Sequence, residues 1–291
     1  MIPIVLADGT AEQQLLSSLR QRSTEVDKKV TESVSQILER VRNEGDAAVR
    51  DYTLKFDGKL PESFEVSRDE INDALSEADP DFVEALLNAQ ANIVEFHNRQ
   101  KHQSFIDAKP NGVILGQRIR GLHRVGLYVP GGTAAYPSSV LMNAIPAKIA
   151  GVEEIIMVTP PLKNGKANPD ILVAASICGV DRVFLMGGAQ AVAALAYGTE
   201  TVPQVDKIVG PGNIFVATAK KLLYGTVDID MIAGPSEILV LADDSADAKY
   251  VAADLMSQAE HDRLASAILI TTSERLAKET AGELERQMAY L

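Results

Sequence analysis

Between about residues 112 and 230, short runs rich in β-branched residues alternate with alanine-rich runs of helical length. This alternation is typical of βαβ units, in which crossover helices join parallel strands. The expected strands are Val125–Val129, Glu154–Val158, Arg182–Met186 and Asp206–Val209, and the expected helices cover about 138–150, 168–178, 189–198 and 213–223. The pattern therefore predicts an α/β protein with a parallel sheet.

The segments on either side of this region have different patterns. The first third is predicted to be helical scaffold, with Ser67 and Asp79 as helix N-caps and an apolar stripe formed by Val30, Val34, Ile37, Leu38 and Val41. The last part predicts one more strand–helix–strand unit: Ile238–Leu241, about 246–260 and Ala267–Ile270. A final helix is expected to begin near Thr272.

Charge and composition exclude several classes of protein. The formal charge of the 291-residue chain is −12, which disfavours binding to nucleic acid because such binding depends on neutralising phosphate with Lys and Arg. The longest uncharged stretch, 125–147, contains Pro130, Pro137 and Pro146, which would interrupt a membrane helix. Cys178 is the only cysteine, so no internal disulfide can form. We therefore expect a cytoplasmic protein with no nucleic-acid or membrane partner.

Glycine-rich turns follow successive expected strands. They are residues 128–132, 186–190, 210–213 and 233–236, and in a parallel sheet all four would lie along one edge. Glycine lets the backbone approach a ligand closely, and free N–H groups at helix starts attract phosphate. Glycine and proline also form ordinary turns, so both interpretations remain open. The usual G-x-G-x-x-G fingerprint is absent because Phe215 occupies its last glycine position, so any nucleotide must bind in a less common manner.

Gln258 and His261 form a second candidate site near the end of the helix at about 246–260. The i, i+3 spacing lets both side chains reach one ion, and imidazole is the commonest metal ligand. Glutamine is an unusual ligand, however, and two ligands do not complete a metal site. A hydrogen-bonded structural pair is therefore the competing interpretation.

Several long motifs resemble one enzyme family. They are GLYVPGG at 126–132, GGAQAVAALAYGTE at 187–200, VDKIVGPGN at 205–213, AGPSEILVLAD at 233–243 and DLMSQAEHD at 254–262. Together they resemble histidinol dehydrogenases, which are zinc- and NAD-dependent enzymes of histidine biosynthesis with a fold related to aldehyde dehydrogenases. Members oxidise L-histidinol through L-histidinal to L-histidine with two NAD⁺.

The resemblance implies roles for six residues. Tyr128, Gln190 and Asn213 are expected to contact NAD, and Ser236 to contact the substrate. Gln258 and His261 are expected to bind Zn²⁺ and also to face the substrate. It further implies two Rossmann-like domains: a discontinuous one of residues 1–124 plus 235–291, which carries the metal ligands, and an NAD-binding one of residues 125–234.

The resemblance also implies that part of the active site lies beyond Leu291. The family's catalytic Glu-His pair, and an Asp and a second His that complete the zinc shell, have no counterpart in these residues. That second His comes from the other subunit of a homodimer. We therefore expect this chain alone to be inactive. The alternatives are a metal-free aldehyde dehydrogenase relative with Cys178 as nucleophile, and a non-catalytic nucleotide-binding module.

Overall fold

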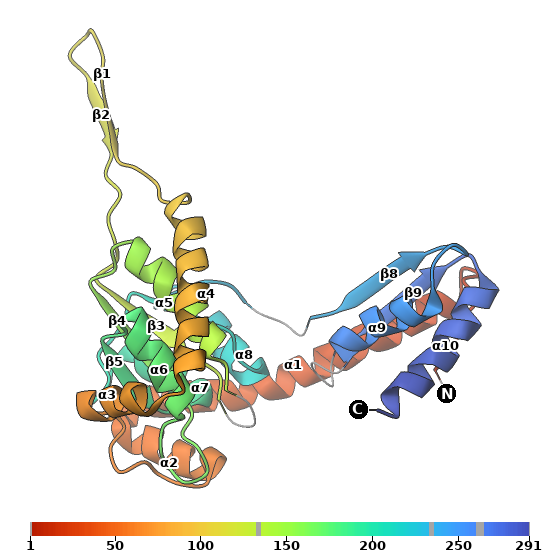
Figure 1. Ribbon diagram of the computed structural model, residues 1–291, viewed down its shortest axis with the longest axis horizontal. Coiled ribbons are helices and arrows are strands. Elements are labelled where there is room, and N and C mark those ends of the chain that lie inside the picture. Colours follow the sequence, from red (N-terminus) through yellow and green to blue (C-terminus); the bar gives the residue numbers. More distant parts are fainter. Residues whose placement is uncertain (1, 132–134, 233–235, 260–264, 291) are drawn as a thin grey trace. The chain divides into compact units, whose positions relative to one another are not determined.

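A computed structural model describes residues 2–131, 135–232, 236–259 and 265–290, with the side chains of 20–27 excepted (Figure 1). The chain forms two compact units, each described here by itself. The larger, the sheet unit, comprises residues 30–233, and the smaller comprises residues 1–29 and 234–291. Residues 30–124, which the expected division placed with residues 235–291, group here with the sheet.

The sheet unit contains five parallel strands that were largely expected from the sequence. Their order is β5-β4-β3-β6-β7, and the bounds are β3 (Arg124–Tyr128), β4 (Glu154–Thr159), β5 (Arg182–Leu185), β6 (Lys207–Val209) and β7 (Asp228–Ile229). The connecting helices are α5 (Pro137–Ile149), α6 (Pro169–Cys178), α7 (Gly188–Tyr197) and α8 (Ile214–Leu223). The predicted strands and helices of this region are confirmed to within about two residues, whereas β7 was not predicted.

The strand order places helices on both faces of the sheet. The chain moves outward from β3 to β5, returns to the other side of β3 and continues to β7, so right-handed crossovers put α5 and α6 on one face and α7 and α8 on the other. The N-terminal helices form an outer layer: α3 (Arg68–Glu77) packs on α6, α4 (Pro80–Asn98) on α5, and α2 (Asp46–Asp57) on α7 (Figure 1). The resulting α/β architecture confirms the predicted fold class.

The predicted scaffold features of the first third are present. The α1 helix (Ala11–Glu44) buries Val30, Val34, Ile37, Leu38 and Val41. Ser67 caps α3 by accepting a hydrogen bond from the Glu70 N–H at 3.1 Å, and Asp79 caps α4 by accepting one from the Asp81 N–H at 2.9 Å. Such caps satisfy N–H groups that have no partner within the helix.

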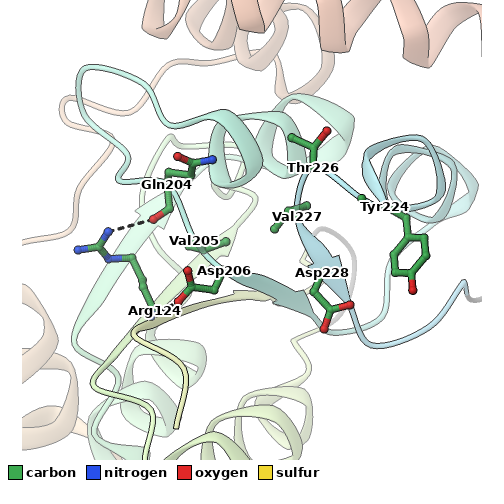
Figure 2. Close-up of a pocket in the computed structure, with 9 residues that line it drawn as sticks. Arg124, Gln204, Val205, Asp206, Tyr224, Thr226, Val227 and Asp228 are labelled. Carbon is green, nitrogen blue, oxygen red and sulfur yellow. Dashed lines mark hydrogen bonds between the residues drawn. The ribbon is translucent and has the colours of Figure 1, made fainter. Parts of the chain in front are cut away.

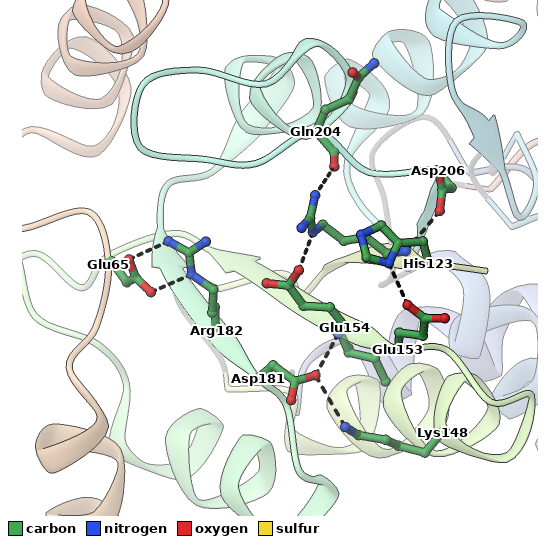
Figure 3. Close-up of polar contacts among 11 residues, drawn as sticks. Glu65, His123, Lys148, Glu153, Glu154, Asp181, Arg182, Gln204 and Asp206 are labelled. Carbon is green, nitrogen blue, oxygen red and sulfur yellow. Dashed lines mark hydrogen bonds and ion pairs between the residues drawn. The ribbon is translucent and has the colours of Figure 1, made fainter. Parts of the chain in front are cut away.

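Two aspartates at the starts of strands fix their neighbours by paired hydrogen bonds (Figure 3). Asp181, just before β5, donates its N–H to the Ile155 carbonyl and accepts the Ile155 N–H on its carboxylate at 2.7 Å. Asp206, just before β6, engages both backbone groups of Arg124 in the same way, with a carboxylate distance of 2.9 Å. Each aspartate therefore holds a single residue at the start of the adjacent parallel strand.

A β-hairpin that was not predicted follows α4. It pairs β1 (Phe105–Ala108) with β2 (Ile114–Gln117) in antiparallel register and extends away from the sheet (Figure 1). All eight strand residues are exposed. In the parts of the chain that the structure describes, no helix is both long and apolar enough to cross a membrane.

The smaller unit contains a second βαβ motif. β8 (Ile238–Ala242) and β9 (Ala267–Thr271) are parallel, with α9 (Ala248–Ala259) between them and α10 (Glu274–Met288) after β9. These elements match the predicted strand–helix–strand and final helix. Ser273 caps α10 by accepting a hydrogen bond from the Leu276 N–H at 3.1 Å.

Candidate functional site

The point where the chain changes direction in the sheet lies between β3 and β6. These strands are adjacent and parallel, with Leu127 opposite Val209, so the turns that follow them leave the same edge. In open α/β sheets, ligands bind at this switch point, beyond the carboxyl ends of the strands. We name this region, which carries the turns after β3, β4, β5 and β6, the carboxyl edge.

Close backbone contacts join these turns. Gly210, after β6, has a φ of 113°, and a Cβ at this residue would lie 2.1 Å from the Tyr128 carbonyl oxygen. Pro160, after β4, lies between Gly131 and Gly187: Cβ atoms added to those glycines would lie 3.2 Å and 2.6 Å from its ring. A side chain at Gly210 or Gly187 would therefore force neighbouring turns apart, whereas one at Gly131 would require only a small adjustment.

Three of the four predicted turns therefore share one edge. The fourth turn includes residues 233–235, which lie outside the described residues, and its Ser236 is an exposed residue of the smaller unit.

Tyr128, at the end of β3, is buried, and its hydroxyl oxygen accepts a hydrogen bond from the Gly188 N–H at 3.0 Å. Burial, with a smaller contribution from the Asp57 carboxylate, raises the pKa of the phenol to about 12, although the hydrogen bond from the Gly188 N–H lowers it. The hydroxyl therefore stays protonated at neutral pH, with its proton available for donation to an acceptor.

Gln190 lies in the first turn of α7 and is 1% exposed. Its Oε1 atom has no hydrogen-bond partner among the described residues. A buried amide without a partner costs about 1–3 kcal/mol, so a residue of this kind in a folded protein usually has a role beyond packing. The unpaired amide oxygen is consistent with a ligand-binding group.

Asn213 caps α8 with its side-chain oxygen, which accepts hydrogen bonds from the Phe215 N–H at 3.0 Å and the Val216 N–H at 3.2 Å. The side chain is exposed, and the cap does not use its amide nitrogen. The helix cap therefore accounts for the hydrogen bonds of the Asn213 side-chain oxygen. The NH₂ group of the same side chain remains a hydrogen-bond donor at the carboxyl edge.

Asp57, at the end of α2, was not identified from the sequence. Its Oδ2 atom is buried without a partner in the described part of the chain, and burial raises the pKa of its carboxyl group to about 6. Its charge contributes to the raised pKa of Tyr128. No local sequence signal marks Asp57, because this electrostatic interaction joins residues that are far apart in the chain.

The predicted metal-binding residues are described only in part. Gln258 is half-buried on α9, and its Oε1 atom is buried with no partner among the described residues. His261 lies outside the described residues. Within the described ranges, no group of three or more His, Cys, Asp or Glu side chains could hold a metal ion. The unpaired Gln258 oxygen nevertheless has the chemistry of a neutral metal ligand.

Cys178 does not have the environment of a nucleophile. It ends α6 and lies in the hydrophobic core, where burial raises the pKa of its thiol to about 12. A catalytic cysteine needs a low pKa and access to substrate. The aldehyde dehydrogenase alternative based on Cys178 is therefore not supported.

An open cavity of about 610 Å³ lies at the opposite end of the strands (Figure 2). Arg124, Asp206 and Asp228, at or just before the starts of β3, β6 and β7, line it together with Tyr224. Arg124 is already paired with Glu154 and with the Gln204 carbonyl oxygen. The cavity thus belongs to the amino ends of the strands and not to the candidate cofactor site.

Comparisons with known proteins identify the family. The family model described as histidinol dehydrogenase matches residues 20–291. The histidinol dehydrogenase of Clostridium acetobutylicum is 53% identical over 288 residues, which are 99% of this chain and 67% of that protein. The enzyme of Listeria innocua is 55% identical over 283 residues, which are 97% of this chain and 66% of that protein.

A solved structure agrees with these matches. The crystal structure of histidinol dehydrogenase from Elizabethkingia anophelis is 41% identical, with a TM-score of 0.78 over 89% of this chain and 60% of that chain. The chain spans about two thirds of the length of the curated relatives it matches. The extent and identity of these matches show that the chain belongs to the histidinol dehydrogenase family.

Proposed function

We propose that this chain carries the NAD-binding part and part of the zinc site of an enzyme that oxidises L-histidinol to L-histidine. The observation that carries the proposal is the arrangement at the carboxyl edge. Tyr128 ends β3, whereas Gln190 and Asn213 follow β5 and β6 of the same sheet. Of these strands, β3 and β6 flank the switch point. Family membership selects histidinol as the substrate.

In this proposal, the three residues bind NAD⁺ through complementary groups. The Tyr128 hydroxyl and the Asn213 NH₂ are donors that internal hydrogen bonds leave available, and the buried Gln190 amide lacks an internal partner for its oxygen. The helices α7 and α8 begin at the same edge, and free N–H groups at a helix start favour the phosphates of a dinucleotide.

Zn²⁺ fits the chemistry of Gln258 and His261, although two neutral ligands fall short of its usual four. When bound, zinc would supply Lewis acidity for the substrate hydroxyl. Gln258 and His261 would orient histidinol, and Ser236 would contact it. We propose that the proton transfers depend on the Glu-His pair of the complete family enzyme, which acts as a cytoplasmic homodimer.

Substituting Gln190 with leucine tests the cofactor site. The Gln190→Leu variant removes a buried amide oxygen that has no partner among the described residues, so we expect the free energy of unfolding to rise by about 1 kcal/mol. The dissociation constant for NAD⁺ should rise about tenfold. Calorimetric titration and urea unfolding measure the two quantities. Gln204→Leu is the control, because Gln204 lies by the cavity at the amino ends of the strands. Unchanged NAD⁺ affinity in Gln190→Leu would contradict the assigned role.

Zinc titration and NADH production test the other half of the proposal. We expect weak zinc binding by these 291 residues and its loss in His261→Ala, with His123→Ala as control because His123 pairs with Glu153 on the surface. We expect no useful NADH production from histidinol, since general acid–base catalysis alone contributes about 10²–10⁴-fold. Robust turnover by these residues alone would place the catalytic groups among them and refute this part of the proposal.

A further inference from the structure

A buried ion pair holds the first residue of the turn at 210–213. Lys220, on α8, is 2% exposed, and its Nζ forms an ion pair with the Asp230 carboxylate and donates to the Gly210 carbonyl oxygen at 3.0 Å. The Asp230 Oδ2 atom accepts the Gly210 N–H at 2.8 Å. The two side chains thus bind both backbone polar groups of one glycine.

Gly210 is the residue through which this turn contacts the turn after β3. Its positive φ and its close approach to the Tyr128 carbonyl oxygen require glycine, and glycine is also the residue with the most backbone freedom to lose on ordering. The hydrogen bonds of Lys220 and Asp230 to the Gly210 carbonyl oxygen and N–H restrict this backbone freedom. Lys220 and Asp230 therefore restrict the geometry between Tyr128 and Asn213.

Packing alone does not explain a lysine at this position. The other buried residues of α8 are apolar: Val216, Ala217, Ala219 and Leu223. Burying a charge is costly, and replacing a buried ion pair with apolar residues often leaves stability unchanged or improves it. A lysine in the middle of this stripe therefore indicates a function other than stabilising the helix.

A second lysine–aspartate pair, in β6 and β7, offers a comparison. Lys207 and Asp228, in β6 and β7, form an ion pair of 2.8 Å at the amino ends of those strands. The Lys207 side chain is 31% exposed and its amine has no hydrogen bond to the turn. This pair has the same chemistry but no contact with the carboxyl edge.

We propose that Lys220 and Asp230 are positioning residues for the nucleotide. They hold Gly210 against Tyr128 before the cofactor arrives, so that less conformational entropy is lost when the cofactor binds. The consequence for affinity rests on the proposed NAD⁺ site, whereas the restraint on the turn can be measured without any nucleotide.

The test uses the 291-residue chain, a Lys220→Met variant and a Lys207→Met control. In Lys220→Met we expect the dissociation constant for NAD⁺ to rise at least about tenfold, equivalent to about 1.4 kcal/mol. Amide hydrogen exchange in the peptide 208–216 should become about tenfold faster in the same variant. Lys207→Met should change either quantity by less than about twofold, since exposed pairs contribute little.

The double variant Lys220→Met/Asp230→Asn separates positioning from stability. It leaves no unpaired buried charge, so its free energy of unfolding should recover towards that of the natural chain, but its NAD⁺ affinity should stay low because the Gly210 carbonyl still lacks its donor. Recovery of affinity together with stability would overturn the proposal, as would unchanged exchange in Lys220→Met. If the natural chain fails to bind NAD⁺, the proposed function fails, and the exchange measurement alone decides on the positioning role.

Discussion

The two compact units use the same βαβ motif but differ in how completely their strands are buried. In the sheet unit, almost every residue of β3, β4 and β5 is buried between helices on both faces. In the smaller unit, β8 and β9 pack mainly against α9, α10 and each other, and Leu239, Leu241 and Ile270 are exposed. Apolar strand sequences are typical of sheets that are covered on both faces. The strand sequence does not itself provide that cover, which depends on other segments that pack on the sheet.

The difference in burial predicts the largest difference in mutational effect. Leu127→Ala, at a fully buried position of β3, should lower the free energy of unfolding by about 3–5 kcal/mol, because it leaves a cavity in a packed core. Leu241→Ala, at a position of β8 that is 77% exposed, should change it by less than about 0.5 kcal/mol. Urea unfolding followed by circular dichroism measures both, and equal losses would show that β8 is covered in solution.

Two carboxyl groups, Asp57 in the sheet unit and Asp244 in the smaller unit, should make stability respond to pH in opposite directions. Burial raises the pKa of Asp57 to about 6, so between about pH 4 and pH 6 the folded sheet unit retains a proton that the unfolded chain has released. The stability that this group contributes is therefore greatest below about pH 4 and falls as the pH rises through about 6. In the smaller unit, hydrogen bonds from Ser273 and Arg275 lower the pKa of Asp244, so acidification removes stability there.

The Asp57→Asn variant tests the first half of this contrast. Because Asp57 is only partly buried, we expect a gain of about 1–2 kcal/mol in the free energy of unfolding at pH 7.5, and no gain at pH 4. Urea unfolding at the two pH values measures the difference. A gain of equal size at both pH values would mean that the carboxyl group does not titrate as described.

The smallest expected difference concerns helix caps. Ser67→Ala in the sheet unit removes one cap hydrogen bond, at a cost of about 1 kcal/mol. Ser273→Ala in the smaller unit should cost slightly more, because the Ser273 hydroxyl also donates to the Asp244 carboxylate. Thermal unfolding of each variant checks the order, and a smaller loss for Ser273→Ala would contradict it.

The sequence predicted the elements of the sheet better than their assembly. Strands such as β4 and caps such as Ser67 were predicted because periodicity and capping are local. The hairpin β1–β2 was not predicted, since neither of its faces is buried to impose an alternating pattern. The packing of α2, α3 and α4 onto the sheet unit was not predicted either, because an apolar helix face does not specify its partner.

The residues of the candidate site were likewise predicted only in part. The glycine turns and the resemblance identified Tyr128, Gln190 and Asn213, whose turns share one edge of the sheet unit. Asp57 was missed because only the tertiary fold brings it near Tyr128. Lys220 could have been identified from the sequence, because it is a charged residue within the apolar stripe of a predicted helix.

The aspartates at the strand starts have a consequence for the order of folding. Asp181 and Asp206 each engage both backbone groups of one residue on a strand that precedes them in the chain. A slip of one residue would break both bonds and turn every side chain of the strand towards the opposite face. During synthesis, β5 and β6 each bring such an aspartate to a strand that is already present, and the paired hydrogen bonds favour one register. Correct alignment can therefore be selected as the chain emerges, before the helices that follow have closed over the sheet.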